Sequence, residues 1–87
     1  MTVHFNMTIV EAVTPVFRKV FDDPSLTLTA ELTASDVELW DSLNHIMLIV
    51  ELETLTDLTF STDQLASLTN VGDFVALIES LGFRGSK

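Results

Sequence analysis

The stretch that decides the fold is ELWDSLNHIMLIVELE, residues 38–53. It places Ser42 between an aspartate and a leucine, where a helical run of apolar residues begins. On a helical wheel at about 100° per residue, one side holds His45, Leu48, Ile49, Leu52 and Leu55. The opposite side holds Leu43, Ile46, Met47 and Val50. A small domain needs only one apolar side for its core, so the second predicts an exposed docking surface. The alternative is a central helix that is buried all round.

Composition limits the possible functions. The chain has 87 residues, of which 47% are hydrophobic, which suits one small domain. Its formal net charge is −9, from 13 acidic and 4 basic residues, and such a surface repels nucleic acid. It favours partners with basic patches, although acidity can also serve solubility alone. The absence of cysteine excludes disulfides and thiolate chemistry, and two separated histidines predict no metal site.

No segment indicates a membrane protein. The longest apolar run, IMLIV at residues 46–50, is far too short to cross a bilayer. The first residues, MTVHFNM, lack the basic and apolar regions of a signal peptide. We therefore expect a cytoplasmic protein.

The first helix is predicted within residues 7–24, where apolar residues recur at helical spacing. Thr8 and Glu11 have the spacing of a capping box. Pro15 should kink this helix. Alternatively, the regular helix begins at Pro15 and is capped by Thr14. The Asp-Asp-Pro sequence at 22–24 should end it.

Residues 25–35, SLTLTAELTAS, alternate apolar and polar side chains as a strand does. No second strand is predicted to pair with it, and an isolated strand is unstable. We therefore expect a long ordered loop whose leucines pin it to the core. Ser35 and Glu38 could cap one helical turn before Trp40.

Three further helices complete the prediction. The second runs from about Ser42 to Leu55, and a short third occupies residues 61–68, with Ser61 or Thr62 near its cap. The last spans residues 70–82, with Asn70 as N-cap and a glycine as C-cap. The sequence thus predicts a small all-α four-helix bundle, a monomer, with a core of about residues 8–82 and a loose tail at 83–87.

Ser42 has two simple interpretations. A serine at a helix start is most often an N-cap. A catalytic serine would need a base within hydrogen-bond reach, and the wheel turns His45 mainly toward the core. No G-x-S-x-G sequence surrounds Ser42 either. We therefore predict no catalytic residue and no enzyme activity.

The segment WDSLNHIMLIVELE, together with Phe60 and the closing LTNVGDFVALIESLG, resembles the acyl carrier and peptidyl carrier protein family. The resemblance extends over nearly the whole chain. It implies that Ser42, with Asp41 beside it, is the attachment point for 4′-phosphopantetheine derived from coenzyme A. The arm would hold an acyl or aminoacyl group as a thioester, so the working thiol would come with the cofactor.

The resemblance also implies a set of partners. These are a phosphopantetheinyl transferase, a loading enzyme and a downstream synthase or transferase of fatty acid, polyketide or nonribosomal peptide biosynthesis. The expected partner-binding residues are Leu43, Ile46, Met47, Val50, Glu51 and Glu53. The chain departs from typical fatty-acid carriers where Asn44, Met47 and Thr54 replace acids. An unmodified helical adaptor that uses the same surface is the alternative.

Overall fold

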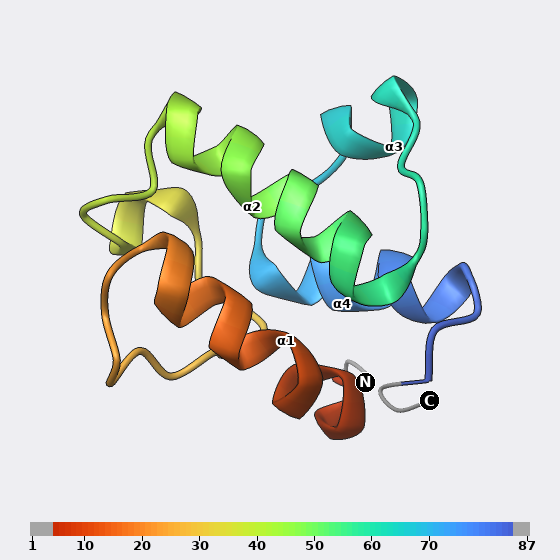
Figure 1. Cartoon of the computed structure of the whole chain (residues 1–87), viewed down its shortest axis with the longest axis horizontal. Helices are drawn as coiled ribbons and strands as arrows, with labels where there is room; N and C mark the ends of the chain where they lie inside the picture. The colour runs from red at the N-terminus through yellow and green to blue at the C-terminus, as the bar shows by residue number, and fades with distance from the viewer. Residues whose placement is uncertain (1–4, 85–87) are drawn as a thin grey trace.

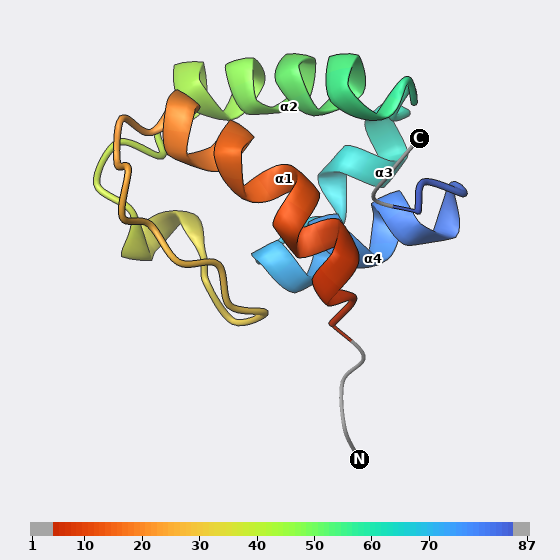
Figure 2. The ribbon, with the colours of Figure 1, turned by 60° about the horizontal axis from the view of Figure 1, so that its bottom comes forward.

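The computed structural model describes residues 5–84, which form an all-α domain with no strand in that range. The helices are α1 (Met7–Val20), α2 (Ser42–Thr56), α3 (Thr62–Ala66) and α4 (Val71–Ser80), and a 3₁₀ turn, η1, spans Ala34–Asp36 (Figure 1). The predicted bundle of three longer helices and a short third one is therefore confirmed. α1 lies against α2 and α4, and α2 runs along one edge of the molecule with no other element on its outer side (Figure 2).

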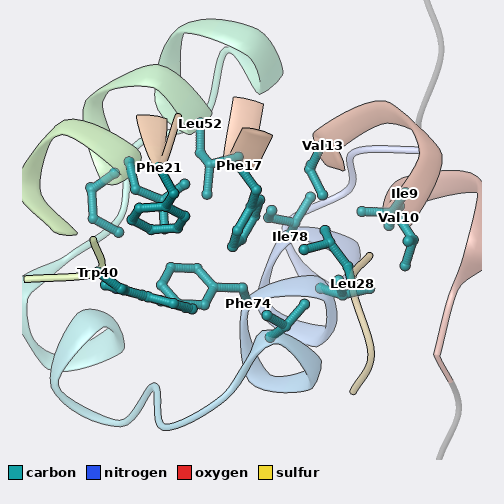
Figure 3. Close-up of a cluster of buried hydrophobic side chains, with 14 of the residues drawn as sticks. Ile9, Val10, Val13, Phe17, Phe21, Leu28, Trp40, Leu52, Phe74 and Ile78 are labelled. Carbon is teal, nitrogen blue, oxygen red and sulfur yellow. The ribbon is translucent and has the colours of Figure 1, made fainter. Parts of the chain in front are cut away.

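The core lies between α1, α2 and α4 and is rich in aromatic rings. Leu48, Ile49 and Leu52 of α2 are buried in the same cluster as Phe17 of α1 and Ile78 of α4, as the wheel predicts. The buried residues of this core also include the apolar stripe of α4 and several loop residues (Figure 3). The complete buried set is Ile9, Val10, Val13, Phe17, Phe21, Leu28, Val37, Trp40, Leu48, Ile49, Leu52, Phe60, Val71, Phe74, Val75 and Ile78.

The start of α1 differs from the prediction. The N-cap is Asn6, whose side chain accepts hydrogen bonds from the N–H groups of Thr8 and Ile9, so the Thr8–Glu11 capping box was wrong. Pro15 lies inside the helix, and the alternative start at Pro15 was wrong too. The Thr14 hydroxyl instead donates to the Val10 carbonyl at 2.6 Å. Asparagine caps better than threonine, and nothing in the apolar pattern distinguishes two candidates that are two residues apart.

The segment after α1 is an ordered loop, as predicted, and its leucines reach the core. Leu28 is buried, and Leu26 and Leu32 pack against the buried cluster. The cap of the turn before Trp40 is formed by Thr33 and Asp36, whose carboxylate accepts the N–H and the hydroxyl of Thr33 at 3.0 and 3.1 Å, and not by Ser35 and Glu38. The predicted turn is therefore correct in kind, but its cap lies two residues earlier.

Two backbone hydrogen bonds fasten this loop to the start of α4. The Val71 N–H donates to the Leu32 carbonyl and the Gly72 N–H to the Ala30 carbonyl, each at 2.9 Å. The first N–H groups of a helix have no partner within the helix, so the loop satisfies two of them. A Cβ at Gly72 would lie 3.0 Å from the Ala30 carbonyl oxygen, which explains glycine at this close approach.

The ends of the described chain pack more closely than predicted. Phe83, assigned to a loose tail, is half-buried against the core, and its N–H donates to the Ile78 carbonyl at 3.3 Å. Phe5, before the predicted core boundary, also packs there. Residues 85–87 of the predicted tail lie outside the described residues.

Candidate functional site

The entry into α2 is shaped by Asp41, not by Ser42. Asp41 is the N-cap, and its carboxylate accepts the N–H of Asn44 at 2.8 Å. Ser42 is the first residue of the helix, so the N-cap interpretation of Ser42 was wrong. The Asn44 side-chain amide reaches back to the Leu39 carbonyl at 2.8 Å. Asp41 and Asn44 therefore fix the direction in which the chain enters the helix.

This arrangement leaves the Ser42 side chain exposed at the N-terminal end of α2. Asp41 performs the capping, and the Ser42 hydroxyl makes no hydrogen bond with any residue in 5–84. A large enzyme could reach this oxygen without unfolding the domain. Free N–H groups and the helix dipole at this end favour a negatively charged group.

Trp40 anchors the chain immediately before the site. Its ring is 8% exposed and stacks on Phe21 with centroids 5.0 Å apart. It also contacts the rings of Phe17 and Phe74, at centroid separations of 5.9 and 6.0 Å. Figure 3 shows Trp40 among these rings, which come from α1, from its C-cap Phe21 and from α4. Because Trp40 is held in the core, the position of Ser42, two residues later, is fixed relative to the core.

His45 is half-buried next to the loop, as predicted, and has a definite partner. The indole N–H of Trp40 donates to His45 Nδ1 at 3.0 Å, and the two rings lie nearly parallel. The ring of Phe74 packs against the imidazole at a centroid distance of 6.0 Å. Sequence reasoning missed this bond. The available signal was a tryptophan and a histidine five residues apart across a helix start.

A surface hollow opens beside Ser42. It has a volume of about 510 Å³, and more of its wall is apolar than polar. Its wall is formed by Ala34, Trp40, Asp41, Ser42, His45 and Ile46. The loop turn η1 therefore faces the first two turns of α2 across this space. The candidate serine lies on the rim of a concave surface.

The second apolar side of α2 is exposed, as the wheel predicts. Leu43, Ile46, Met47 and Val50 are 67, 61, 48 and 55% exposed. Leu39 in the preceding loop is also exposed, at 42%, and extends the apolar surface toward the site. The sequence did not indicate Leu39, because no periodicity covers that turn. We call the four helix residues the α2 patch.

The two acids predicted to flank the patch each make an internal contact. One oxygen of Glu51 lies 3.3 Å from Lys19 Nζ on α1. One oxygen of Glu53 accepts the N–H of Phe60 at 2.9 Å and so supports the connector between α2 and α3. Both acids lie in the C-terminal half of α2, about 14–17 Å along the axis from Ser42 at 1.5 Å per residue. The second carboxylate oxygen of each acid makes no hydrogen bond within residues 5–84.

Within residues 5–84, no three potential metal-binding side chains of His, Asp or Glu gather in one place. Over the same range, no helix has the length and apolar character needed to cross a membrane.

Comparison with known proteins identifies the family. No protein-family model and no curated protein matches the chain. A solved structure does: the solution NMR structure of a holo acyl carrier protein from Geobacter metallireducens. It is 46% identical, the alignment covers 85% of each chain, and the TM-score is 0.80. The chain belongs to the acyl carrier protein family.

Membership in the acyl carrier protein family agrees with the geometry of the site. This family member is a carrier protein, and its matched relative is described in the holo form. An exposed serine with a free hydroxyl at the start of a 15-residue helix can accept a covalent group. The resemblance inferred from WDSLNHIMLIVELE is thus confirmed at the level of the family and the fold.

Proposed function

We propose that this carrier holds an acyl or aminoacyl intermediate as a thioester on a 4′-phosphopantetheine arm attached to Ser42. The observation that carries the proposal is the exposed, unbonded Ser42 hydroxyl at the start of α2, in a chain 46% identical to a holo acyl carrier protein. Asp41 holds the helix start in place and so presents the serine.

A phosphopantetheinyl transferase would carry out the attachment. The Ser42 oxygen forms a new bond to the phosphorus that bears the pantetheine, and the phosphorus–oxygen bond within the pyrophosphate of coenzyme A breaks. The 3′,5′-ADP leaves with the electron pair, and the serine proton passes to a base supplied by the transferase. The carrier contributes no acid or base here, which agrees with the absence of any hydrogen-bonded base on the Ser42 hydroxyl within residues 5–84.

Partner enzymes would dock on the α2 patch. Its four side chains follow the i, i+3, i+4, i+7 spacing of one helix face, so they span only about 10 Å along the axis. Such a small contact suits transient association, which a carrier needs because it must visit a loading enzyme and then a downstream synthase or transferase. The net charge of −9 would steer basic partner surfaces toward the carrier.

The acids Glu51 and Glu53 belong to the proposed partner surface through their second carboxylate oxygens. Their internal contacts hold both side chains near α2 and so reduce the entropy that docking would otherwise cost. Partners would contact the α2 patch near Ser42, and they would contact the two acids in the C-terminal half of the helix.

Mass spectrometry tests the attachment directly. Incubation with coenzyme A and a broad-specificity transferase should add one phosphopantetheine group to the wild-type chain. Ser42→Ala should remain unmodified, whereas Ser61→Ala, which changes the N-cap serine of α3, should be modified like the wild type. A wild-type chain that stays at its unmodified mass with an active transferase would favour the alternative, an unmodified helical adaptor.

A further inference from the structure

Three side-chain hydrogen bonds join the end of the loop to the first turns of α2, on either side of Ser42. Two of them, both at 2.8 Å, are the bonds that Asn44 makes to the loop. The third runs from Trp40 Nε1 to His45 Nδ1 at 3.0 Å, between residues five positions apart. The loop end is thereby fastened to the helix start, and Ser42 lies inside the fastened segment.

The bond between Trp40 and His45 depends on the charge of the imidazole. Indole is only a donor, so the bond requires that Nδ1 carry no proton. Protonation turns Nδ1 into a donor, and two donors then face each other. Histidine side chains change charge between about pH 5 and 8, whereas an amide does not titrate and carboxylates change charge near about pH 4. Of the three bonds, this one is therefore the bond that is lost in mildly acidic solution.

Two acids lie on the elements that surround the imidazole. On the wall of the hollow, Asp41 is the ionisable side chain beside His45, and its carboxylate can pair with the imidazolium once that has formed. On α4, the ring of Phe74 contacts the imidazole, and the preceding Asp73 accepts the N–H and the hydroxyl of Thr69 at 2.8 and 2.7 Å. Asp73 is thus occupied within α4 and its cap, and Asp41 is the negative charge on the side of the serine.

The charged groups of the loop and of α1 face elsewhere. Asp36 and Glu38 line a different surface hollow. The two basic residues in the last turn of α1 bond to a loop carbonyl and to Glu51. Among these neighbours, His45 is the group that changes charge near neutral pH.

We infer that His45 is a positioning residue for the modification of Ser42, an inference that rests on the proposed attachment there. Neutral His45 holds Trp40 against the start of α2, and so keeps the serine in the orientation that a transferase must find. Protonation breaks the bond, and a smaller fraction of the chains then presents the serine correctly. Modification therefore slows in acid by up to about fivefold, the factor that one ordinary hydrogen bond contributes to an equilibrium.

NMR spectroscopy of the complete unmodified chain tests the bond independently of the modification. Trp40 is the one tryptophan of the sequence, so its indole N–H gives a single signal. At about pH 8, where imidazole is neutral, we expect a scalar coupling through the hydrogen bond between Trp40 Nε1 and His45 Nδ1. The coupling should disappear as the ring signals of His45 report its protonation, while the circular dichroism spectrum stays the same. A coupling that is absent in the neutral form, or that persists in the charged form, overturns the inference.

Two substitutions of His45 separate the acceptor from the ring. The side-chain oxygen of asparagine lies two bonds from Cβ, as Nδ1 of histidine does, so His45→Asn keeps an acceptor that does not titrate. His45→Phe keeps a ring beside Phe74 but has no acceptor. Mass spectrometry measures kcat/KM for each carrier between about pH 5 and 8. Each value is divided by that of His45→Asn at the same pH, which cancels the pH dependence of the transferase itself.

The ratios distinguish a failure of the positioning role from a failure of the attachment. The ratio for the wild type should fall by up to about fivefold as the pH is lowered, and the ratio for His45→Phe should be low at every pH. A wild type that gains no phosphopantetheine at any pH refutes the attachment to Ser42. Normal addition with a constant wild-type ratio refutes the positioning role alone, as do equal rates for His45→Asn and His45→Phe.

A substitution of the donor replaces this comparison if both His45 variants unfold. Trp40→Phe keeps a ring among the core aromatics but has no N–H to donate. It should be modified up to about fivefold more slowly than the wild type in neutral solution, and at the rate of the wild type once the imidazole is charged. The same ratio of the two rates at every pH overturns the inference.

Discussion

Replacing Leu52 with alanine should strongly destabilise the domain. Leu52 is 0% exposed, in the cluster that joins α2 to α1 and α4. Truncation removes the transfer free energy of the lost carbons and leaves a cavity. Its neighbours in the cluster include Phe17 and Ile78, which are also 0% exposed, so the site has little room to collapse.

The size of this effect can be compared with the stability of the whole domain. Leucine-to-alanine changes in cores cost about 2–5 kcal/mol. At about 0.05–0.15 kcal/mol per residue, the chain of 87 residues is stable by about 4–13 kcal/mol. A loss of about 3 kcal/mol should therefore lower Tm by roughly 12–24 °C.

Guanidinium unfolding measures this free energy. The chain has one tryptophan, Trp40, which is 8% exposed in the native core and should report unfolding by fluorescence alongside circular dichroism. Val50→Ala, on the opposite side of α2 and 55% exposed in the wild type, is the control and should change stability by less than about 0.5 kcal/mol. A Leu52→Ala protein within about 1 kcal/mol of the wild type would refute the assignment of the buried side.

Four other substitutions test the partner surface, an ionisable side chain in the first turn of α4 and the contact between the loop and α4. Ile46→Ala and Met47→Glu should leave the circular dichroism spectrum and Tm nearly unchanged. Both should slow the modification of Ser42 or the loading of cargo, measured as a time course. If both variants unfold, the α2 patch is part of the core. Hydrogen bonds from the Thr69 hydroxyl and N–H lower the pKa of Asp73 below its ordinary value, outweighing its partial desolvation. A lowered folded-state pKa stabilises the fold above the unfolded pKa, and this contribution is lost as pH falls through the folded pKa. Asp73→Asn should thus be destabilised at pH 7, and the difference in unfolding free energy should narrow below about pH 4; a constant difference would contradict this. Gly72→Ala should speed amide hydrogen exchange at residue 72, because the new Cβ would lie 3.0 Å from the Ala30 carbonyl oxygen. This is expected even though alanine favours the helix by about 1 kcal/mol. Unchanged protection from exchange would show that the loop moves away from the new Cβ at little cost.

The helices and their faces could be predicted because apolar spacing is a local property. The two sides of α2 separated correctly on the wheel, with Leu48 and Leu52 buried and Ile46 exposed. The N-cap Asn70 of α4 was predicted correctly and Ser61 was one of two candidates for α3, but the predicted caps of α1 and η1 were wrong. At each of these two helix starts, two side chains that can act as N-cap lie within two residues of each other, as Asn6 and Thr8 do. The direction of the backbone before the helix decides which of them caps it.

The parts of the site that were missed depend on contacts between distant elements. Glu51 meets Lys19, which lies 32 positions away in the sequence, only because α1 crosses α2. The bond from Trp40 to His45 needs the loop to fold back on the core before the helix begins. The motif indicated Ser42 as a candidate, but the hollow beside it also needs Ala34 of η1, and no sequence pattern relates that turn to α2.

The fastening of the loop to α4 has a consequence for protein synthesis. Ribosomes make the chain from its N-terminus, so Ser42 is synthesised before the residues of α4. At about 5–20 residues per second, the stretch from Ser42 to Ser80 takes about 2–8 s to complete. Until then the Ala30 and Leu32 carbonyls lack their helix partners, and Trp40 lacks the ring of Phe74. A transferase that recognises the folded surroundings of Ser42 should therefore not modify nascent chains and should act only on the completed domain.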